Sequence, residues 1–371
     1  MLDWNGPLRN FFNSINCNTP VDLASQIREL EEEIKRTPYN KATEHHVGRL
    51  KAKLARLREE LEKERAKSAR QTISIKKEGD ATVALVGYPS VGKSTLLNAL
   101  TGAKSEVADY DFTTKKPVPG ILEYKHAVIQ IIDMPGIVEG AASGRGRGKE
   151  VISAVRIADL IVIVADVFRL ETIDIVKKEL YEGGIRLDQK PPEIVIKRKE
   201  RGGIKVSSTV PLSVDEKTIA EIMKEYRIHN AEVLFREDVS VERLIDVLAG
   251  NRVYIPSVTV VNKIDLMDVD FEGIKISAEK GINLERLKEE IYRKLDFVNI
   301  YLKPPGEKVS EKPMVLRRGA RVEDVCRKLH RDFVEKFRYA RVWGKSVRFE
   351  GQRVGLDHVL CDGDVVSIYS D

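Results

Sequence analysis

The sequence is poor in cysteine and has no long apolar run, and these absences exclude several classes of protein. The three cysteines, Cys17, Cys326 and Cys361, form no CxxC pair, which argues against a disulfide framework or a zinc site and favours a reducing compartment. No apolar run of about 18 residues occurs, so we expect no membrane span. Met1–Pro20 lacks a convincing signal-peptide pattern, and we interpret it as a poorly ordered extension of a cytoplasmic protein.

The composition that is present indicates a folded chain of several domains. A length of 371 residues suggests two or three domains, and 42% hydrophobic residues provide for sizeable cores. The net charge of +5 is compatible with RNA or ribosome contact, although a solvated surface is the commoner reason for such a charge. We expect no DNA partner.

The segment from Val21 to about Arg70 has the apolar spacing of helices. A turn at Thr37–Asn40, with Asn40 as candidate N-cap, predicts two antiparallel helices. Lysines and arginines alternate with glutamates on the second helix. This indicates either a salt-bridged helix face or a docking arm for RNA or a protein partner.

Four short apolar runs have the character of buried parallel strands, each ending at a polar residue or a glycine-rich turn. In an open α/β sheet, ligands bind at the carboxyl ends of such strands. The predicted strands are Thr82–Val86, Ala127–Ile132, Leu160–Ala165 and Val258–Val261.

The segment Gly87–Ser94 fits the pattern G-x-x-x-x-G-K-[ST], follows a predicted strand and opens a predicted helix, which predicts a P-loop. Glycines let backbone N–H groups approach phosphates closely, and the helix N-terminus adds a positive dipole end. Lys93 supplies a charge to the β- and γ-phosphates. The expected nucleotide contacts in this segment are Gly87, Tyr88, Pro89, Ser90, Val91, Gly92, Lys93, Ser94 and Thr95.

A magnesium site is predicted beside this loop. The Ser94 hydroxyl is a suitable Mg²⁺ ligand, Asp133 can hold the ion through water, and Thr114 is the better of two adjacent threonines for the triphosphate state. Gly136 leaves room for the γ-phosphate, and its N–H can form a contact that depends on whether that phosphate is present. We therefore assign catalytic roles to Lys93, Thr114 and Gly136.

The segment Asn262-Lys263-Ile264-Asp265 predicts guanine selectivity. The Asp265 carboxylate can accept from guanine N1–H and the 2-amino group together, and adenine would leave it unpaired. Asn262 can brace the loop and Lys263 can lie along the base. Farther along the chain, Ser277 and Ala278 follow a strand-like stretch, and the Ala278 N–H could bind guanine O6.

Hydrolysis of a bound GTP needs a group that orients the attacking water, and the residue at the usual position of that group cannot do so here. A Ras-like enzyme uses a Gln after the DxxG glycine, and here that position is Ile137. Candidates are the Thr114 backbone, the loop Glu139–Gly148 with its two arginines, a monovalent cation or a partner. We expect slow intrinsic turnover. Since a monovalent cation is among these candidates, K⁺ is a second candidate cofactor, and Ser90 in the P-loop leaves a dependence on K⁺ open.

The ordered set GYPSVGKS, DYDFTTKKP, DMPGIVEGAASGRGRGKE, NKID and SAEKG resembles the Obg-related GTPases. With the basic arm containing NKATEHH, the insertion and the short carboxyl tail, the chain from Asp22 to Asp371 is similar to the developmentally regulated GTP-binding protein family, in an archaeal-like form. The resemblance implies a helix-turn-helix-like arm, a C-terminal TGS domain of ubiquitin-like fold, and roles around the ribosome with RNA contact. Eukaryotic members have a dedicated regulatory partner protein.

The expected fold class is α/β: a doubly wound P-loop GTPase sheet with an N-terminal helical hairpin, an α+β insertion and a C-terminal β-grasp domain. The helix predicted at Asp238–Leu248 is interpreted as the return to the sheet. The expected divisions are an extension at 1–20, the arm at 21–79, the G domain at 80–182 and 238–296, the insertion at 183–237 and the TGS domain at 297–371.

Two functions fit these patterns. The first is a Mg²⁺-dependent GTPase that acts as a molecular switch on ribosomes or RNA. The second is an RNA- or ribosome-binding module whose nucleotide is structural, favoured by the basic arm, by Ile137 and by the basic run Lys197–Arg201, which is more often a solvated hairpin.

Overall fold

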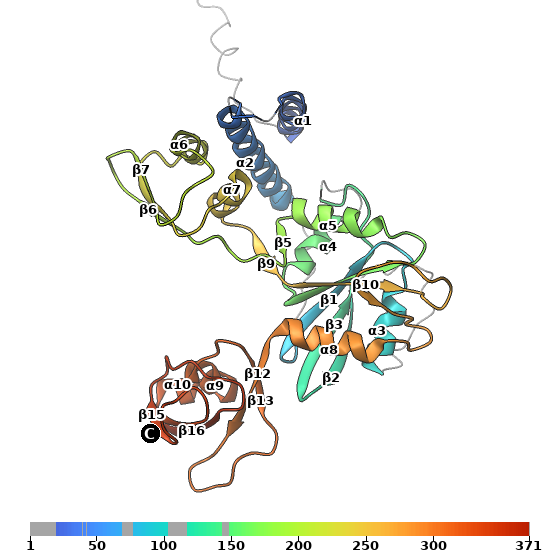
Figure 1. The fold of residues 1–371 in the computed structure, drawn as a ribbon, viewed down its shortest axis with the longest axis vertical. Coiled ribbons are helices and arrows are strands. Elements are labelled where there is room, and N and C mark those ends of the chain that lie inside the picture. The colour runs from blue at the N-terminus through green and yellow to red at the C-terminus, as the bar shows by residue number, and fades with distance from the viewer. Residues whose placement is uncertain are drawn as a thin grey trace, which may run out of the picture. The chain divides into compact units, whose positions relative to one another are not determined.

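The computed structural model describes residues 20–38, 40–41, 43–68, 77–102, 117–142 and 148–370 (Figure 1). The chain forms two compact units. One combines Met1–Thr72 with Lys190–Arg252, and the other combines Ile73–Gln189 with Val253–Asp371. Among the described helices, none is long and apolar enough to cross a membrane.

The second unit contains a six-stranded sheet of order β11-β10-β4-β1-β3-β2. All its neighbouring strands run parallel except the antiparallel pair β2 and β3. Strands β1, β3, β4 and β10 agree with the four predicted from the sequence. The strands are β1 (Ala81–Gly87), β2 (Val118–Tyr124), β3 (Ala127–Asp133), β4 (Leu160–Asp166), β10 (Ser257–Asn262) and β11 (Ile274–Lys275).

Helices cover both faces of this sheet, because alternate residues of each strand point to opposite sides. Val83 and Leu85 pack with α3 (Lys93–Thr101) and α8 (Leu284–Leu295). Ala84 and Val86 pack with α4 (Gly148–Val155) and α5 (Thr172–Glu182). A small parallel pair, β5 (Ile185–Leu187) and β9 (Val253–Ile255), extends this body.

Strand β2 was not predicted. Its burial is uneven, with Val118 and Ile121 exposed, so it lacks the continuous apolar character of its neighbours. It joins β3 through Lys125 and His126, both at positive φ (48° and 71°). Such hairpin turns favour Asn and Gly. Because the turn residues here are Lys and His, the sequence did not predict the turn.

The first unit joins the helical arm to the insertion. The arm is α1 (Pro20–Arg36) and α2 (Glu44–Ser68), joined where Thr43 N donates to Asn40 Oδ1 at 3.0 Å. The insertion contains a three-stranded sheet of order β6-β8-β7. Its elements are β6 (Ile194–Arg198), β7 (Ile204–Ser208), α6 (Glu216–Glu225), β8 (Ala231–Phe235) and α7 (Val241–Ala249).

The boundaries of the insertion differ from those expected. Helix α7, interpreted from the sequence as the return to the P-loop sheet, buries Leu244 and Ile245 against Ile222 and Phe235 of the insertion. The insertion therefore extends to Arg252 rather than ending at residue 237. Within the insertion, Gly202 and Gly203, both at positive φ, lie between β6 and β7.

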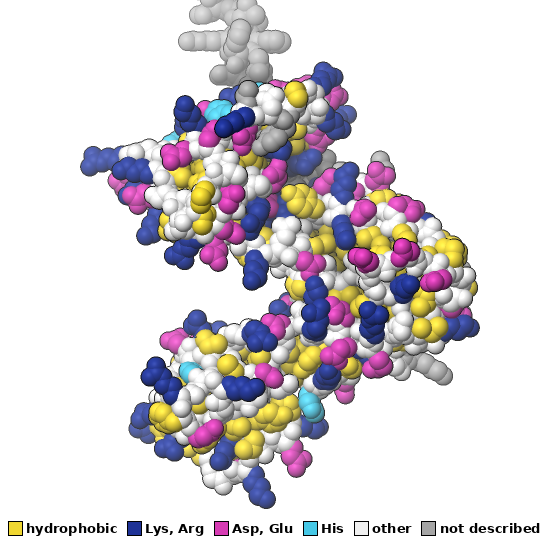
Figure 2. Space-filling model, in the orientation of Figure 1, with side chains coloured by type: hydrophobic (Ala, Val, Ile, Leu, Met, Phe, Trp, Pro, Cys, Tyr) yellow, Lys and Arg dark blue, Asp and Glu magenta, His cyan; other side chains and the backbone are white. Residues whose placement is uncertain are grey.

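Three basic residues of α2 are paired with acidic residues of this unit. Lys51 contacts Glu242 at 2.5 Å, Arg58 contacts Glu31 at 2.7 Å, and Arg56 lies 3.7 Å from Glu225. Figure 2 shows cationic and anionic side chains interspersed on the visible face of the molecule. These pairs favour the salt-bridged interpretation of the arm at those positions.

The C-terminal part forms a five-stranded sheet of order β13-β12-β16-β14-β15, in which β12 and β16 run parallel. Helices pack against this sheet around a core that includes Val298, Val325 and Val342. This is the predicted β-grasp arrangement. Its elements are β12 (Phe297–Leu302), β13 (Met314–Arg317), α9 (Val322–Leu329), α10 (Asp332–Glu335), β14 (Phe337–Trp343), β15 (Gln352–Val354) and β16 (Val365–Ser370).

Candidate nucleotide site

The loop from Gly87 to Ser94 joins the carboxyl end of β1 to the first turn of α3. Ser90 and Gly92 adopt left-handed backbone conformations, with φ of 66° and 89°. A Cβ at Gly92 would lie 2.5 Å from Asn262 Nδ2, and one at Gly87 would lie 2.1 Å from Val164 O. These glycines therefore allow close approach of the neighbouring strands, and the loop presents its backbone at the helix N-terminus, where anions bind.

Lys93 is almost fully buried, at 7% exposure. Its ammonium donates to Gly87 O at 3.2 Å and to Tyr88 O at 2.9 Å, so it folds back under the loop. Burial lowers the pKa of Lys93 to about 8, and the negative charge of Asp133 offsets part of that shift. A buried cation beneath a phosphate-binding loop is positioned to neutralise phosphate charge.

Ser94 and Asp133 lie together although they come from α3 and β3. The Ser94 hydroxyl donates to Asp133 Oδ2 at 2.5 Å, and Asp133 is 1% exposed. A hydroxyl and a carboxylate are oxygen donors of the kind that Mg²⁺ prefers. These two residues fit a magnesium ion, while Thr114, the third predicted ligand, lies outside the described residues.

Gly136 and Ile137 follow β3 and contact the P-loop. A Cβ at Gly136 would lie 2.7 Å from the Pro89 ring, so only glycine fits there. The Ile137 N–H donates to Gly87 O at 3.0 Å, and its side chain is buried at 1% exposure. Ile137 therefore has a packing role and offers no polar side-chain group to a water.

The base-recognition segment lies at the carboxyl end of β10, next to the P-loop. Asn262 is buried and donates to Val91 O at 3.0 Å, and its Oδ1 accepts from Ala278 N at 2.9 Å. Lys263 Nζ donates to Ser90 O at 2.9 Å. The Ala278 N–H, expected to bind guanine O6, thus bonds the Asn262 side chain in this structure.

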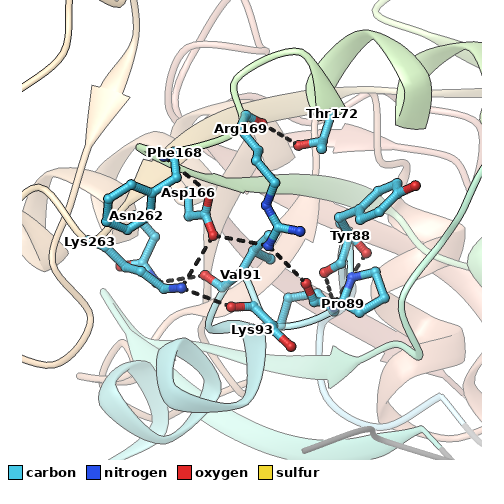
Figure 3. Close-up of polar contacts among 12 residues, drawn as sticks. Tyr88, Pro89, Val91, Lys93, Asp166, Phe168, Arg169, Thr172, Asn262 and Lys263 are labelled. Atoms are coloured by element: carbon cyan, nitrogen blue, oxygen red, sulfur yellow. Dashed lines mark hydrogen bonds and ion pairs between the residues drawn. The ribbon is translucent and has the colours of Figure 1, made fainter.

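Asp265 and Ser277 complete the predicted set. Asp265 is exposed at the turn after β10. Ser277 is fully buried and its Oγ accepts from Lys280 N at 3.1 Å, so it shapes the loop that carries Ala278. The contacts of Asn262 with Val91 O and of Lys263 with Ser90 O bring the base segment and the P-loop together (Figure 3).

Three charged residues of this region were not predicted as site residues. Asp166 ends β4 and contacts Lys263 at 3.2 Å, and Arg169 follows it in the loop to α5. Glu179 lies on α5 at 3% exposure and accepts from Gly140 N at 2.6 Å and Ala142 N at 2.7 Å. The polar residue ending an apolar strand was a signal for Asp166, whereas nothing in the sequence distinguishes Glu179 from the other glutamates of its helix.

Three protein-family models match successive parts of the chain. A model described as a 50S ribosome-binding GTPase matches residues 82–198, one for the C-terminal region of that domain matches 201–297, and the TGS domain matches 298–370. Among solved structures, the Schizosaccharomyces pombe YchF GTPase is similar at 15% identity and a TM-score of 0.40, covering 81% of this chain and 100% of that one.

Curated relatives match nearly the whole chain. An uncharacterized GTP-binding protein of Methanocaldococcus jannaschii is 59% identical, covering 94% of this chain and 93% of its own. Human developmentally-regulated GTP-binding protein 2 is 45% identical, covering 94% of this chain and 99% of its own.

The fold, the P-loop edge and these matches define a P-loop GTP-binding protein with a C-terminal TGS domain. At this identity and coverage, the chain belongs to the developmentally regulated GTP-binding protein family. The predicted family and fold class are thereby confirmed.

Proposed function

We propose that this protein hydrolyses GTP to GDP and phosphate, with Mg²⁺, as a molecular switch that acts on ribosomes or RNA in the cytoplasm. The observation that carries the proposal is the meeting of Lys93, the Ser94–Asp133 pair and the Asn262–Lys263 segment at one sheet edge. Phosphoryl transfer needs positioning and charge neutralisation more than covalent help, and this edge supplies both.

The phosphate side would act through charge and backbone donors. Lys93 would turn its ammonium from the loop carbonyls to the β- and γ-phosphates, and the P-loop N–H groups would hold their oxygens. Ser94, Asp133 and Thr114 would hold Mg²⁺, which neutralises charge on the phosphates when bound. The Gly136 N–H would contact the γ-phosphate, so a triphosphate and a diphosphate would leave this segment in different states.

The base side would select guanine. Asp265 would accept from N1–H and the 2-amino group, while Asn262 holds the loop against Val91 O. Lys263 would lie along the base while bonded to Ser90 O. An adenine nucleotide would leave the Asp265 carboxylate without its two donors, which disfavours binding.

Intrinsic hydrolysis is proposed to be slow, since Ile137 is buried and cannot orient water. The orienting group would come from the Thr114 backbone, the loop that follows Ile137, a K⁺ ion or a regulatory partner protein. Rates in K⁺ and Na⁺ buffers would separate the cation from the other candidates.

The ribosomal role is supported by the family model matched at residues 82–198, whose description is that of a 50S ribosome-binding GTPase. The second candidate is a ribosome- or RNA-binding module with a structural nucleotide, and the buried Ile137 favours it. The two candidates differ in whether turnover is part of the activity.

The Lys93→Ala variant tests the proposal. We expect it to lose measurable single-turnover GTP hydrolysis, and we expect wild-type protein to co-sediment with ribosomes more strongly with a GTP analogue than with GDP. Lys288→Ala is the matched control: this lysine lies on α8, its ammonium contacts Glu285 at 2.7 Å, and the variant should keep wild-type turnover. Equal co-sedimentation in both nucleotide states together with no wild-type turnover would favour the structural-nucleotide candidate.

A further inference from the structure

The buried carboxylate of Asp166, at the end of β4, links the base segment and the P-loop, which the proposed function describes separately. Asp166 is 1% exposed. Its Oδ2 accepts from Lys263 Nζ at 3.2 Å and from Arg169 Nη2 at 3.4 Å, and its Oδ1 accepts from Phe168 N at 3.3 Å (Figure 3). Of these residues, Lys263 alone belongs to the predicted nucleotide contacts.

Both cations on Asp166 also reach backbone carbonyls of the P-loop. Lys263 Nζ donates to Ser90 O at 2.9 Å, and Arg169 Nη2 lies 3.5 Å from Pro89 O. The Arg169 guanidinium further lies 5.9 Å from the centre of the Tyr88 ring. Asp166 is therefore linked to the P-loop indirectly, through the side chains of Lys263 and Arg169.

The backbone at both ends of the Lys263–Ser90 bond is in an uncommon conformation. Ser90 has φ of 66° and Lys263 has φ of 69°. Non-glycine residues in the left-handed region persist where surrounding contacts hold them, and they cluster at functional sites. The bond between these two residues links the phosphate loop to the base loop, and Asp166 holds the donor of that bond.

The charge balance explains why the carboxylate is needed. A buried carboxylate is stable when it is paired and hydrogen-bonded, and here two cations share one oxygen. Without the negative charge, Lys263 and Arg169 would repel each other, and Lys263 would leave Ser90 O for solvent.

We propose that Asp166 is a positioning residue for guanine nucleotides: it holds Lys263 in place and thereby fixes the base loop and the P-loop in one geometry. It acts through Lys263, whereas Arg169 supports the P-loop from the other side. The proposal rests on guanine-nucleotide binding, and it is independent of the proposed hydrolysis and of the ribosomal role.

Asp166→Asn is the direct test, because it keeps the side-chain shape and removes the charge. We expect affinity for GDP and for GTP to fall by about 10-fold each, since the lost contact serves the base side that both share. Calorimetric titration at fixed Mg²⁺ and salt measures this. Unchanged affinity for both nucleotides would overturn the proposal.

Asp188→Asn is the matched control. The Asp188 carboxylate lies in the same body, accepts from Ser257 N at 3.0 Å and contacts Lys294 at 2.8 Å, outside the nucleotide residues. We expect its nucleotide affinities to stay within about twofold of wild type. An equal loss in this variant would show that the effect of Asp166→Asn is general destabilisation.

A double-mutant cycle separates positioning from a merely structural role. If Asp166 acts through Lys263, adding Asp166→Asn to Lys263→Met should change affinity by less than about twofold. The same loss in both backgrounds would contradict the proposal. Arg169→Met should weaken nucleotide binding less than Asp166→Asn does, and a loss equal to that of Asp166→Asn would mean that Asp166 acts through Arg169 instead.

The double variant Asp166→Asn with Arg169→Met keeps the test decisive if the single variant folds poorly. It removes one negative and one positive charge together, so the net charge of the cluster is unchanged. Lys263 still lacks its carboxylate partner. We expect the loss of about 10-fold to persist in it. Wild-type affinity in this variant would overturn the proposal.

Discussion

The base side and the phosphate side of the site are held by different kinds of contact. On the base side, Asn262 and Lys263 bond P-loop carbonyls more than 170 residues earlier in the chain. On the phosphate side, the Lys93 ammonium bonds carbonyls of its own loop, five and six residues away. Base recognition therefore depends on the tertiary fold, whereas Lys93 can redirect its ammonium with no rearrangement of the sheet.

Under the proposed function, this difference separates the residues that select the base from those that take part in hydrolysis. Long-range contacts through a buried amide and a buried carboxylate tie the base loop to the P-loop and to β4, which suits discrimination between bases. The phosphate side combines a buried lysine with a hydroxyl–carboxylate pair, Ser94 and Asp133, which suits groups that change partners during a reaction. The predictions below act on one side or the other.

The largest expected effect is on the base side. Asp265→Asn places an amide where guanine presents two donors, so two charge-assisted hydrogen bonds are lost, and GDP affinity should fall by about 100-fold or more. Xanthine nucleotides, which have an oxygen in place of the 2-amino group, should bind this variant better than guanine nucleotides. Competition binding with GDP and XDP measures both.

Asp268→Asn is the control for that change. It lies in the loop that follows the turn of Asp265, and its side chain is 94% exposed. We expect its GDP affinity to match wild type, and a comparable loss there would mean that Asp265 acts through loop charge rather than through the base.

A smaller effect is expected at Glu179, which holds the segment following the Gly136–Ile137 pair. Glu179→Gln replaces one acceptor oxygen by a donor, so one of the two part-buried backbone N–H groups, that of Gly140 or of Ala142, loses its partner. The free energy of unfolding should fall by about 1–3 kcal/mol. Urea unfolding measures it, with the exposed Glu182→Gln on the same helix as control, and equal stability of the two variants would contradict this role.

The smallest expected effect is on the phosphate side, where GDP binding should change the protonation of Lys93. The pKa of Lys93 is about 8 against an ordinary 10.5, so between these values the unfolded chain binds more protons here than the folded chain. Its contribution to the free energy of unfolding therefore rises with pH across that window. Phosphate anions should raise this pKa again, so GDP binding near pH 8.5 should take up less than about one proton.

Calorimetry of GDP binding in two buffers of different ionisation enthalpy measures that uptake. Lys93→Met should bind GDP more weakly and without the uptake. If this variant takes up as many protons as wild type, another group is responsible.

Much of the fold and of the phosphate side could be predicted from the sequence. Continuous apolar runs gave β1, β3, β4 and β10, and the Gly87–Ser94 pattern depends on local backbone chemistry that glycines and a lysine reveal. Strand β2 was missed because its turn residues, Lys125 and His126, lack the usual turn chemistry. Helix α7 was misassigned because its amphipathic pattern shows one buried face but not which core buries it.

The unpredicted site residues have a common reason. Asp166 and Glu179 contact partners that are distant in sequence, Lys263 for the first and the backbone of Gly140 and Ala142 for the second. No spacing rule links such residues before the fold is known. Thr114, by contrast, was predicted from its motif and lies outside the described residues, so its role stays a prediction.

The most direct test of the account is a calorimetric titration of the full chain with GDP, GTP, ADP and ATP in Mg²⁺. The account predicts that both guanine nucleotides bind at least about 100-fold more tightly than the adenine nucleotides, because adenine offers Asp265 no matching donors. Equal affinity for guanine and adenine nucleotides would contradict it.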